Sequence, residues 1–338
     1  MTVPVDRRRR ALLAFGALGA AGGVGLGAAY ASRREPAPAP ADGGPFDVDG
    51  PSGALFREAE LAGTGTVMQS FSFDNDNRWV VAAQIRDRAE GDLRLSRLTL
   101  DGDLDGEMML YGFGHGGQIG VVSDGTASEV WLEAAPRTEG DAAWGTRVAR
   151  VRFADGDEAD ATSDTVEEFD LVPGASRTTC TVDSRHRRLA VRFTLDGEER
   201  FRVYDLDHVT GGGRTPAVDV PAPRRHATTA NPTPYSQGFA LFGRYLYTLE
   251  GGPYGTADSE APTGNTYVTC TDLSVRGGRV VASRHLTDAA DLPFREPEGM
   301  AVLLPGGDAR HGPRLAFGLA SIRDGKTRLA SIYYKDTR

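Results

Sequence analysis

The run QGFALFGRYLYTLE at residues 237–250 decides the fold, because it joins two segments of alternating apolar side chains through a short turn. A period of two is that of a β-strand, so the run predicts a β-hairpin. The same pattern recurs at four other places in the chain. The five hairpins span residues 69–84, 118–133, 178–193, 237–250 and 298–319.

The hairpins recur at a nearly constant period. They begin at residues 69, 118, 178, 237 and 298, which gives intervals of 49, 60, 59 and 61 residues. A third alternating run follows each hairpin, and a weaker fourth run follows in four of the five units. Such a period is typical of propeller blades. We therefore predict an all-β protein folded as a five-bladed β-propeller, with a pair of β-sandwiches or another blade number as alternatives.

The two ends of the repeat array predict how the ring closes. The fifth unit has no room for a fourth strand before Arg338, and an alternating run at residues 54–61 precedes the first unit. We predict that this N-terminal strand closes the last blade without a covalent bond. No segment has convincing helical periodicity, and 43 glycines with 19 prolines supply the turns.

The first residues resemble an export signal rather than part of the fold. Arg7–Arg10 are followed by an uncharged apolar run, and Ala29-Tyr30-Ala31 offers a cleavage site. We predict a twin-arginine-type signal peptide at residues 1–31, a Pro/Ala/Gly-rich linker at residues 32–52 and the propeller at residues 53–338. An ordinary Sec signal or an uncleaved membrane anchor is the alternative. The expected location is outside a bacterial cell, secreted or associated with the cell wall.

Charge and cysteine content limit the partners. The net charge of −9 argues against a nucleic-acid partner, and after signal cleavage we expect no membrane contact. In an exported protein the two cysteines, Cys180 and Cys270, can pair, but burial of two free thiols as small apolar groups is the favoured interpretation.

Propeller geometry brings distant polar residues to one rim. The first strand of a blade lines the central channel, and the antiparallel second strand ends at the rim where the first begins. The predicted rim therefore contains Gln69, Gln84, Gln118, Glu133, Thr178, Gln237, Glu250 and Glu298. The residues that precede the inner strands should border it, and they include His115, Arg177, Tyr235, Arg295 and Glu296.

These residue types suit a hydroxyl-rich ligand with anionic groups, because amides bind hydroxyl groups and arginine binds carboxylate or phosphate. The predicted ligand contacts are Gln69, Gln84, Gln118, Arg177, Tyr235, Gln237 and Arg295. If the protein is an enzyme, His115 is the candidate base and Glu133, Glu296 and Glu298 are the candidate acids, as in glycoside hydrolysis. Alternatively, the same side chains hydrogen-bond one another and tie the blades together. No metal site is predicted, and any cofactor is left open.

Several other segments are interpreted as loops and turns. Asp101–Gly106 resembles the start of a calcium loop, but its twelfth position would be Gly112, so a hairpin turn is favoured. Asp74–Asn77 is predicted as the turn of the first hairpin. The loops at 222–234, with His226, and 251–264, with Tyr254, are left unassigned.

Four short motifs resemble a known group of propellers. They are Phe294-Arg-Glu-Pro-Glu-Gly-Met300, Met68-Gln-Ser-Phe71, Tyr111-Gly-Phe-Gly-His115 and Ser236-Gln-Gly-Phe239. Together they resemble the β-propeller shared by teichoic acid biosynthesis protein C-like proteins and some phage receptor-binding proteins, over residues 54–336. The resemblance implies a five-bladed propeller and a link to cell-wall glycopolymers, and it implies no catalytic role for any residue.

Three functions are compatible with these observations. The leading hypothesis is binding of an envelope polysaccharide, such as a teichoic acid or another anionic glycan, at the rim. The second is cleavage of such a polymer by a hydrolase or lyase. The third is a structural or protein-docking propeller whose rim binds no glycan.

Overall fold

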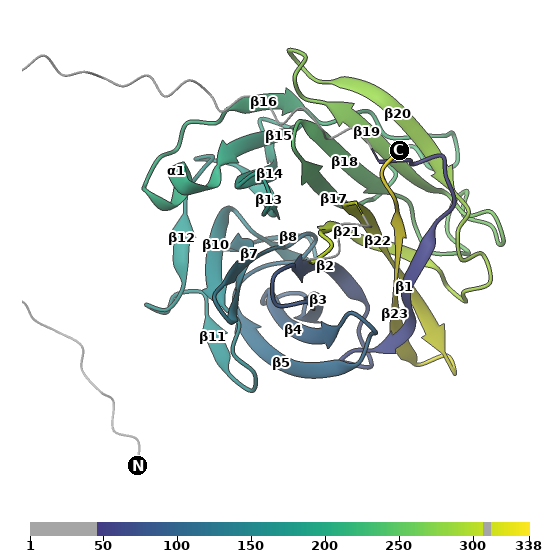
Figure 1. Ribbon diagram of the computed structural model, residues 1–338, viewed down its shortest axis with the longest axis horizontal. Coiled ribbons are helices and arrows are strands. Elements are labelled where there is room, and N and C mark those ends of the chain that lie inside the picture. The colour runs from purple at the N-terminus through teal and green to yellow at the C-terminus, as the bar shows by residue number, and fades with distance from the viewer. Residues whose placement is uncertain (1–45, 307–311) are drawn as a thin grey trace, which may run out of the picture. The chain divides into compact units, whose positions relative to one another are not determined.

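The computed structural model describes residues 46–306 and 312–338. The predicted signal peptide at residues 1–31 and most of the predicted linker lie outside these residues. Within the described part, strands dominate and five sheets radiate from a common centre (Figure 1). The predicted all-β, five-bladed propeller is thereby confirmed. In the same part of the chain, no helix is both long and apolar enough to cross a membrane.

The first three blades follow one another along the chain. Blade 1 contains β2 (Met68–Asp74), β3 (Trp79–Asp87), β4 (Asp92–Thr99) and β5 (Leu104–Tyr111), with β11 (Glu158–Asp160) added in parallel at its outer edge. Blade 2 contains β6 (Gly120–Asp124), β7 (Ala127–Ala134), β10 (Arg147–Arg152) and β12 (Glu167–Phe169). Blade 3 contains β13 (Ser176–Asp183), β14 (Arg188–Leu195), β15 (Glu198–Asp205) and β16 (Val218–Pro221).

The last two blades complete the ring. Blade 4 contains β17 (Ser236–Phe242), β18 (Tyr245–Glu250), β19 (Thr266–Asp272) and β20 (Arg279–Leu286). Blade 5 contains β21 (Glu296–Leu303), β22 (Arg314–Arg323), β23 (Thr327–Lys335) and β1 (Gly53–Glu60). Because β1 pairs antiparallel with β23, the predicted closure of the last blade by the N-terminal strand is confirmed.

Period-two alternation explains the core. The buried apolar residues form five clusters, and each cluster lies between two neighbouring blades. In β17, for example, Phe239 and Leu241 face blade 3, whereas Ala240 and Phe242 face blade 5. Since successive side chains of a strand point to opposite faces, one strand contributes to two interfaces. The alternating pattern in the sequence is therefore the pattern of blade-to-blade packing.

Residues just before β1 also pack onto the propeller. Phe46 is fully buried between the rings of Phe242 and Tyr247, and its N–H donates to the Tyr247 hydroxyl at 3.0 Å. It also forms a β-bridge with Thr337. Phe46, seven residues before Gly53 and within the segment predicted as linker, therefore already packs onto the propeller.

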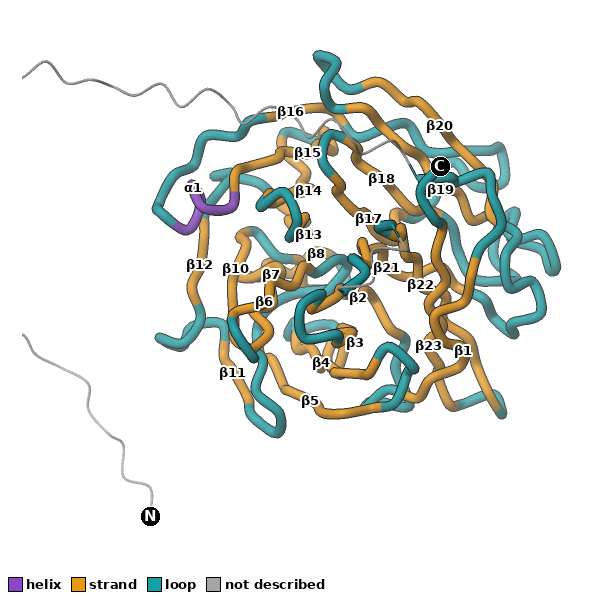
Figure 2. The backbone as a smooth tube through the Cα atoms, viewed as in Figure 1, coloured by secondary structure: helices purple, strands orange, loops and turns teal. Residues whose placement is uncertain are grey.

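Two elements have no counterpart in the predicted repeat. A short hairpin of β8 (Arg137–Glu139) and β9 (Ala142–Trp144) is inserted between the second and third strands of blade 2. One short helix, α1 (Leu206–Thr210), connects β15 with β16 (Figure 2). Asp205 caps it by accepting a hydrogen bond from the N–H of His208 at 2.8 Å. Five residues are too few to produce helical periodicity in a sequence.

The turn assignments and the cysteines agree with the structure. The buried carboxylate of Asp74 accepts from the N–H of Asn77 at 3.1 Å and from Ser128 of blade 2 at 2.5 Å, so the first hairpin turn also ties two blades together. Cys180 lies between blades 2 and 3, and Cys270 lies between blades 4 and 5. Both thiols are buried and free, and burial raises the pKa of each.

Candidate functional site

A β-bulge at the start of the inner strand places the polar residue of the repeat. In blades 1, 3, 4 and 5 the register between the first two strands shifts at this point, so the inner strand holds one residue more than its partner. Such bulges re-aim a side chain and interrupt the regular pairing. The bulges contain Gln69 in β2, Arg177 and Thr178 in β13, Gln237 in β17, and Glu298 in β21.

Glycine lets these bulges meet around the axis. A Cβ atom on Gly238 would lie 2.7 Å from Cα of Gly299, and one on Gly299 would lie 2.7 Å from Cα of Ser70. Gly299 also has φ of +78°, which costs other L-residues energy. The glycines after Gln237 and Glu298 therefore allow close approach of the inner strands of blades 4, 5 and 1.

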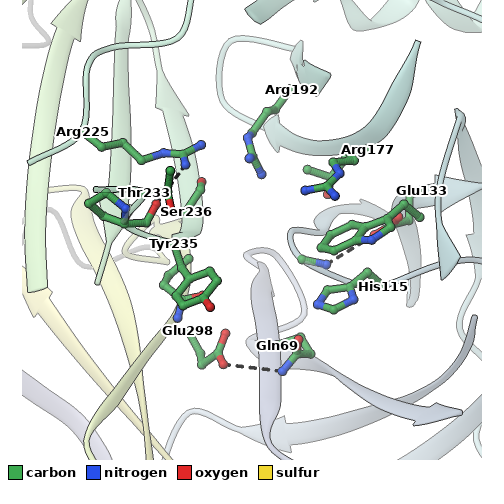
Figure 3. Close-up of a pocket in the computed structure, with 15 residues that line it drawn as sticks. Gln69, His115, Glu133, Arg177, Arg192, Arg225, Thr233, Tyr235, Ser236 and Glu298 are labelled. Carbon is green, nitrogen blue, oxygen red and sulfur yellow. Dashed lines mark hydrogen bonds between the residues drawn. The ribbon is translucent and has the colours of Figure 1, made fainter. Parts of the chain in front are cut away.

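A cavity of about 300 Å³ opens at this rim. Residues from β2, β7, β13, β14, β17 and β21 contribute to it, together with the inserted hairpin and two loops. Its walls are formed by Gln69, His115, Gly117, Glu133, Trp144, Arg177, Thr179, Arg192, Arg225, Thr233, Pro234, Tyr235, Ser236, Gln237 and Glu298 (Figure 3).

Three guanidinium groups border the cavity. Figure 3 shows Arg225 on one side, Arg177 on the opposite side and Arg192 between them. Arg177 donates to Glu139 of the inserted hairpin at 2.8 Å. Arg192 donates to Glu199 at 2.9 Å, and Arg225 donates to the same carboxylate.

The shared carboxylate of Glu199 fixes two of these arginines. Burial alone would raise the pKa of Glu199, but Arg192 and Arg225 lower it to about 2, so the group is ionised. Arg225 also donates to the carbonyl of Pro234 at 2.9 Å, which holds the loop at 222–234 against the cavity. One carboxylate thus orients two cations, and part of their positive charge stays available to a ligand.

The side of the cavity opposite Arg225 is an aromatic wall (Figure 3). The rings of His115 and Trp144 are stacked, with centroids 4.0 Å apart and planes inclined by 14°. The guanidinium of Arg177 lies 4.9 Å from the Trp144 ring. Burial, and then the charges of Arg88 and Arg177, lower the pKa of His115 to about 4, so the imidazole is neutral near neutral pH. Its Nδ1 atom is buried and has no hydrogen-bond partner among the described residues.

The floor of the cavity is formed by amides and carboxyl groups. The Gln69 amide donates to Glu298 at 3.5 Å (Figure 3). Burial and the nearby charge of Glu296 raise the pKa of Glu298 well above its usual range. Burial also raises the pKa of Glu296, to about 6, against the opposing effects of Arg328 and of a hydrogen bond from Gln237. These two carboxyls therefore contribute little negative charge in mildly acidic solution.

The carboxylate of Glu133 connects two loops beside the cavity. Its Oε1 atom accepts from the N–H of Gly116 at 2.7 Å, and its Oε2 atom accepts from the N–H of Gly145 at 2.6 Å. Burial raises the pKa of Glu133, whereas the surrounding N–H groups lower it. Because both oxygens are occupied, this carboxylate holds the loop of His115 against the turn that follows Trp144. Its predicted role as a free catalytic acid does not fit this geometry.

The structure brings together seven of the predicted site residues. Those that line the cavity are Gln69, His115, Glu133, Arg177, Tyr235, Gln237 and Glu298. Glu296 lies behind the wall and reaches it through its hydrogen bond with Gln237. The side chain of Tyr235 is 68% exposed, so it stands at the open mouth.

Three other predicted ligand contacts do not line this cavity, and their side chains are buried and hydrogen-bonded within the protein. Gln84 donates to the carbonyls of Gly63 and Thr66 at 2.6 and 2.8 Å and so ties down the chain that enters β2. Arg295 donates to the carbonyls of Asp288 and Leu286 at 2.8 and 2.9 Å. Gln118, the third, lies at the axis.

The Gln118 amide closes the channel beneath the cavity. Its Oε1 atom accepts from the N–H groups of Phe239 and Met300 at 3.0 and 3.3 Å, and its Nε2 atom donates to the carbonyls of Ile119 and Met300, both at 2.9 Å. One fully buried side chain thus joins blades 2, 4 and 5. Two more residues of the predicted rim, Thr178 and Glu250, do not line this cavity. Thr178 is buried, and the carboxylate of Glu250 bonds to His226.

Replacement of Gln118 by leucine should destabilise the protein by about 2–4 kcal/mol, because two buried N–H groups lose their acceptor at about 1–3 kcal/mol each. Urea unfolding followed by tryptophan fluorescence measures the difference. The matched change Gln237→Leu, at a half-buried rim position, should alter stability by less than about 1 kcal/mol. Equal effects of the two changes would contradict the role assigned to Gln118.

Eight further residues of the cavity were not predicted from the sequence: Gly117, Trp144, Thr179, Arg192, Arg225, Thr233, Pro234 and Ser236. Trp144 belongs to the inserted hairpin, which lies outside the repeat. Arg225 and Thr233 belong to the loop at 222–234, which was noticed but left unassigned. Arg192 is one position before the expected rim end of the second strand, and its length carries the guanidinium into the cavity.

Comparisons with known proteins agree with the fold. A family model for a phage 5-bladed β-propeller receptor-binding platform domain matches residues 67–333. The chain is 26% identical over 305 residues to a protein of Bacillus subtilis (strain 168) provisionally named major teichoic acid biosynthesis protein C. The match covers 85% of this chain and 63% of that relative's length.

A solved structure is also similar. The tail fiber of Staphylococcus aureus phage P68 superposes with a TM-score of 0.67 at 18% identity. The superposition covers 86% of this chain and 53% of the fiber chain. At this level of identity the likeness concerns the fold alone.

Proposed function

Since the chain belongs to the family of phage 5-bladed β-propeller receptor-binding platform domains, we propose that it binds an anionic, hydroxyl-rich polymer of the bacterial cell envelope in the rim cavity. A teichoic acid, in which polyol or sugar units are joined by phosphate groups, has this chemistry. We also propose that the predicted export signal delivers the propeller to the outer side of the membrane, where such polymers occur.

The observation that carries this proposal is the placement of Arg177, Arg192 and Arg225 around one cavity. Among the described residues, two carboxylates, Glu139 and Glu199, pair with the three guanidinium groups, so the cluster keeps a net positive charge. One arginine guanidinium group can donate two parallel hydrogen bonds to the oxygens of one phosphate group. An anionic group in the cavity can therefore bind several guanidinium groups at once.

The rest of the cavity suits the uncharged parts of such a polymer. The amides of Gln69 and Gln237 can donate to and accept from hydroxyl groups. The stacked rings of His115 and Trp144 supply a flat aromatic wall beside them. The names of the relatives support the same class of ligand, because they concern receptor binding by phages and teichoic acid biosynthesis.

Co-sedimentation with cell-wall sacculi tests the proposed function. The purified protein should sediment with sacculi that carry wall teichoic acid, and it should stay in the supernatant with sacculi stripped of phosphodiester-linked polymers by hydrogen fluoride. Soluble polyglycerol phosphate should compete, and neutral dextran should not. Equal sedimentation with intact and stripped sacculi would refute binding of an anionic polymer.

Binding should weaken as the pH rises. Because the pKa of Glu296 is raised to about 6, this carboxyl is mostly neutral at pH 5 and mostly ionised at pH 7.5. Ionisation adds a negative charge behind the floor, which repels an anionic ligand. We expect the dissociation constant for polyglycerol phosphate, measured by calorimetry, to rise about threefold or more over this range.

A Glu296→Gln variant gives the control for this pH dependence. It should keep nearly the same affinity from pH 5 to pH 7.5, because the amide does not ionise. His115, whose pKa is about 4, contributes no charge change in this range. An undiminished pH dependence in the variant would assign the effect to other groups.

Polymer cleavage is the second candidate function, and the paired carboxyls of Glu296 and Glu298 favour it. A carboxyl group with a raised pKa can act as a general acid on a glycosidic oxygen. A time course of fragment release from purified wall polymer tests this function. Release by the wild type that is lost in Glu298→Gln would support it, and an inert wild type that still binds the polymer would leave binding alone.

A further inference from the structure

A second cavity lies beside the rim site, between blade 4 and the loop that connects blade 3 to blade 4. Its volume is about 290 Å³, close to the 300 Å³ of the rim cavity. One wall is the loop at 222–234, and the other is formed by the loop at 251–264 and the start of β19. Pro234 lines both cavities, so a single residue forms part of the boundary between them.

The walls of this second cavity are fixed by contacts between the two loops. The Thr228 hydroxyl donates to Asp258 across the opening, and Glu250 bonds to both His226 Nδ1 and its N–H. The His226 ring stacks on Tyr267, which stacks in turn on His285, with centroids 3.9 and 4.8 Å apart. A column of three rings thus supports the loop, so the cavity is largely preformed.

The chemistry of the second cavity differs from that of the rim site. Its lining contains two carboxylates, Glu250 and Asp258, and neither arginine nor lysine. A phosphate group would be repelled there. The Asn231 amide and the Asp258 carboxylate are instead groups that suit sugar hydroxyls. The Asn265 amide bonds to Gly252 and Ala257, and Glu250 bonds to His226, so these two side chains shape the cavity.

A catalytic interpretation of the same residues fits less well. Ser283 Oγ lies 3.1 Å from His226 Nε2, and the Nδ1 atom faces Glu250, which is the order of a serine–histidine–acid triad. However, Ser283 is not part of the lining of either cavity, and its hydroxyl contacts Thr269 Oγ1 at 2.7 Å. The Ser283 hydroxyl therefore faces neither cavity, and His226 serves to hold the loop in place.

From this contrast we infer that the second cavity is a subsite for an uncharged sugar unit of the polymer whose phosphate occupies the rim cavity. This inference rests on the proposed function, since it takes the same polymer as the ligand of both cavities. The protein would then recognise a charged unit and a sugar side by side, across Pro234 and the exposed Tyr235.

Two matched ligands test the subsite: a glycerol phosphate hexamer, and the same hexamer carrying a glucosyl group on each unit. The full-length wild type should bind the glucosylated hexamer about tenfold more tightly, as two or three additional hydrogen bonds would provide. Calorimetry measures both dissociation constants.

Three variants separate the possible outcomes. Asn231→Trp, which fills the second cavity, should reduce the preference for the glucosylated hexamer to less than about twofold and leave the affinity for the plain hexamer unchanged. Asn231→Ala, which removes an amide that bonds to the sugar but leaves the cavity open, should keep part of the preference. Arg192→Ala should weaken both ligands by the same factor.

The outcomes distinguish this inference from the proposed function. If the wild type binds both hexamers equally, or if Asn231→Trp retains the preference, the subsite does not exist, although the function stands. If the wild type binds neither hexamer nor intact sacculi, the function itself fails and the subsite with it.

Discussion

Removal of the guanidinium groups of Arg177 and Arg192 should weaken binding of polyglycerol phosphate at least about 100-fold. Each charge-assisted hydrogen bond contributes about 1.5–3 kcal/mol, and tenfold in affinity corresponds to about 1.4 kcal/mol. Arg225 is left in place because it then still pairs with the ionised Glu199, so no buried carboxylate is stranded. The double variant Arg177→Ala/Arg192→Ala is therefore expected to fold normally.

The control for this variant removes the same charge elsewhere. Arg187 and Arg200 form exposed ion pairs with Asp207 and Asp219, both at 2.6 Å, and neither arginine lines the cavity. Arg187→Ala/Arg200→Ala should alter affinity by less than about threefold, since surface charges are screened by salt. Calorimetry at constant ionic strength compares the two. Equal losses in both variants would mean that only overall charge matters and that the cavity is not the binding site.

The second large effect concerns stability. Replacement of Gly299 by alanine should lower the free energy of unfolding by about 3–5 kcal/mol, through a positive φ that disfavours a Cβ and through overpacking against a neighbouring strand. The new methyl group would lie 2.7 Å from Cα of Ser70 and 2.9 Å from the N atom of Phe71. Because both atoms are backbone of an inner strand, the ring would have to widen to accept it.

Gly65 supplies the matched substitution. A Cβ atom there has nothing within 4 Å, and the residue lies in an exposed turn before β2. Gly65→Ala should change stability by less than about 0.5 kcal/mol in the same urea titration. A Gly299→Ala protein as stable as Gly65→Ala would show that the inner strands do not meet as closely as described.

The repeat made most of the fold predictable. Alternation of apolar residues reports the two faces of each strand, and each face packs against another blade, so blade number and order follow from spacing alone. Closure of the last blade by the N-terminal strand was also predictable, because a fifth blade with three strands of its own requires a fourth strand from elsewhere in the chain. The hairpin β8–β9 is inserted in blade 2 without changing the alternation of apolar residues in its strands. The repeat therefore did not predict this hairpin.

The candidate site was predictable only in part. Equivalent positions identified Gln69, Gln237 and Glu298, since the bulge recurs wherever an inner strand begins. Equivalence cannot distinguish a side chain that faces the cavity from one that turns into the axis, which is why Gln118 was misplaced. Arg225 lies in a loop, and no periodicity relates a loop residue to the strands it will contact.

The amide of Gln118 has a consequence for how a long polymer can be held. The Gln118 amide bonds to residues of blades 2, 4 and 5 at the propeller axis. A polymer of the proposed kind would therefore not pass through the central channel, and it would enter and leave the protein at the rim cavity. If the protein binds a polymer as proposed, it can take up a segment from the middle of the chain across this rim, without a free end and without cutting the chain. Several copies can then occupy one polymer side by side and leave independently.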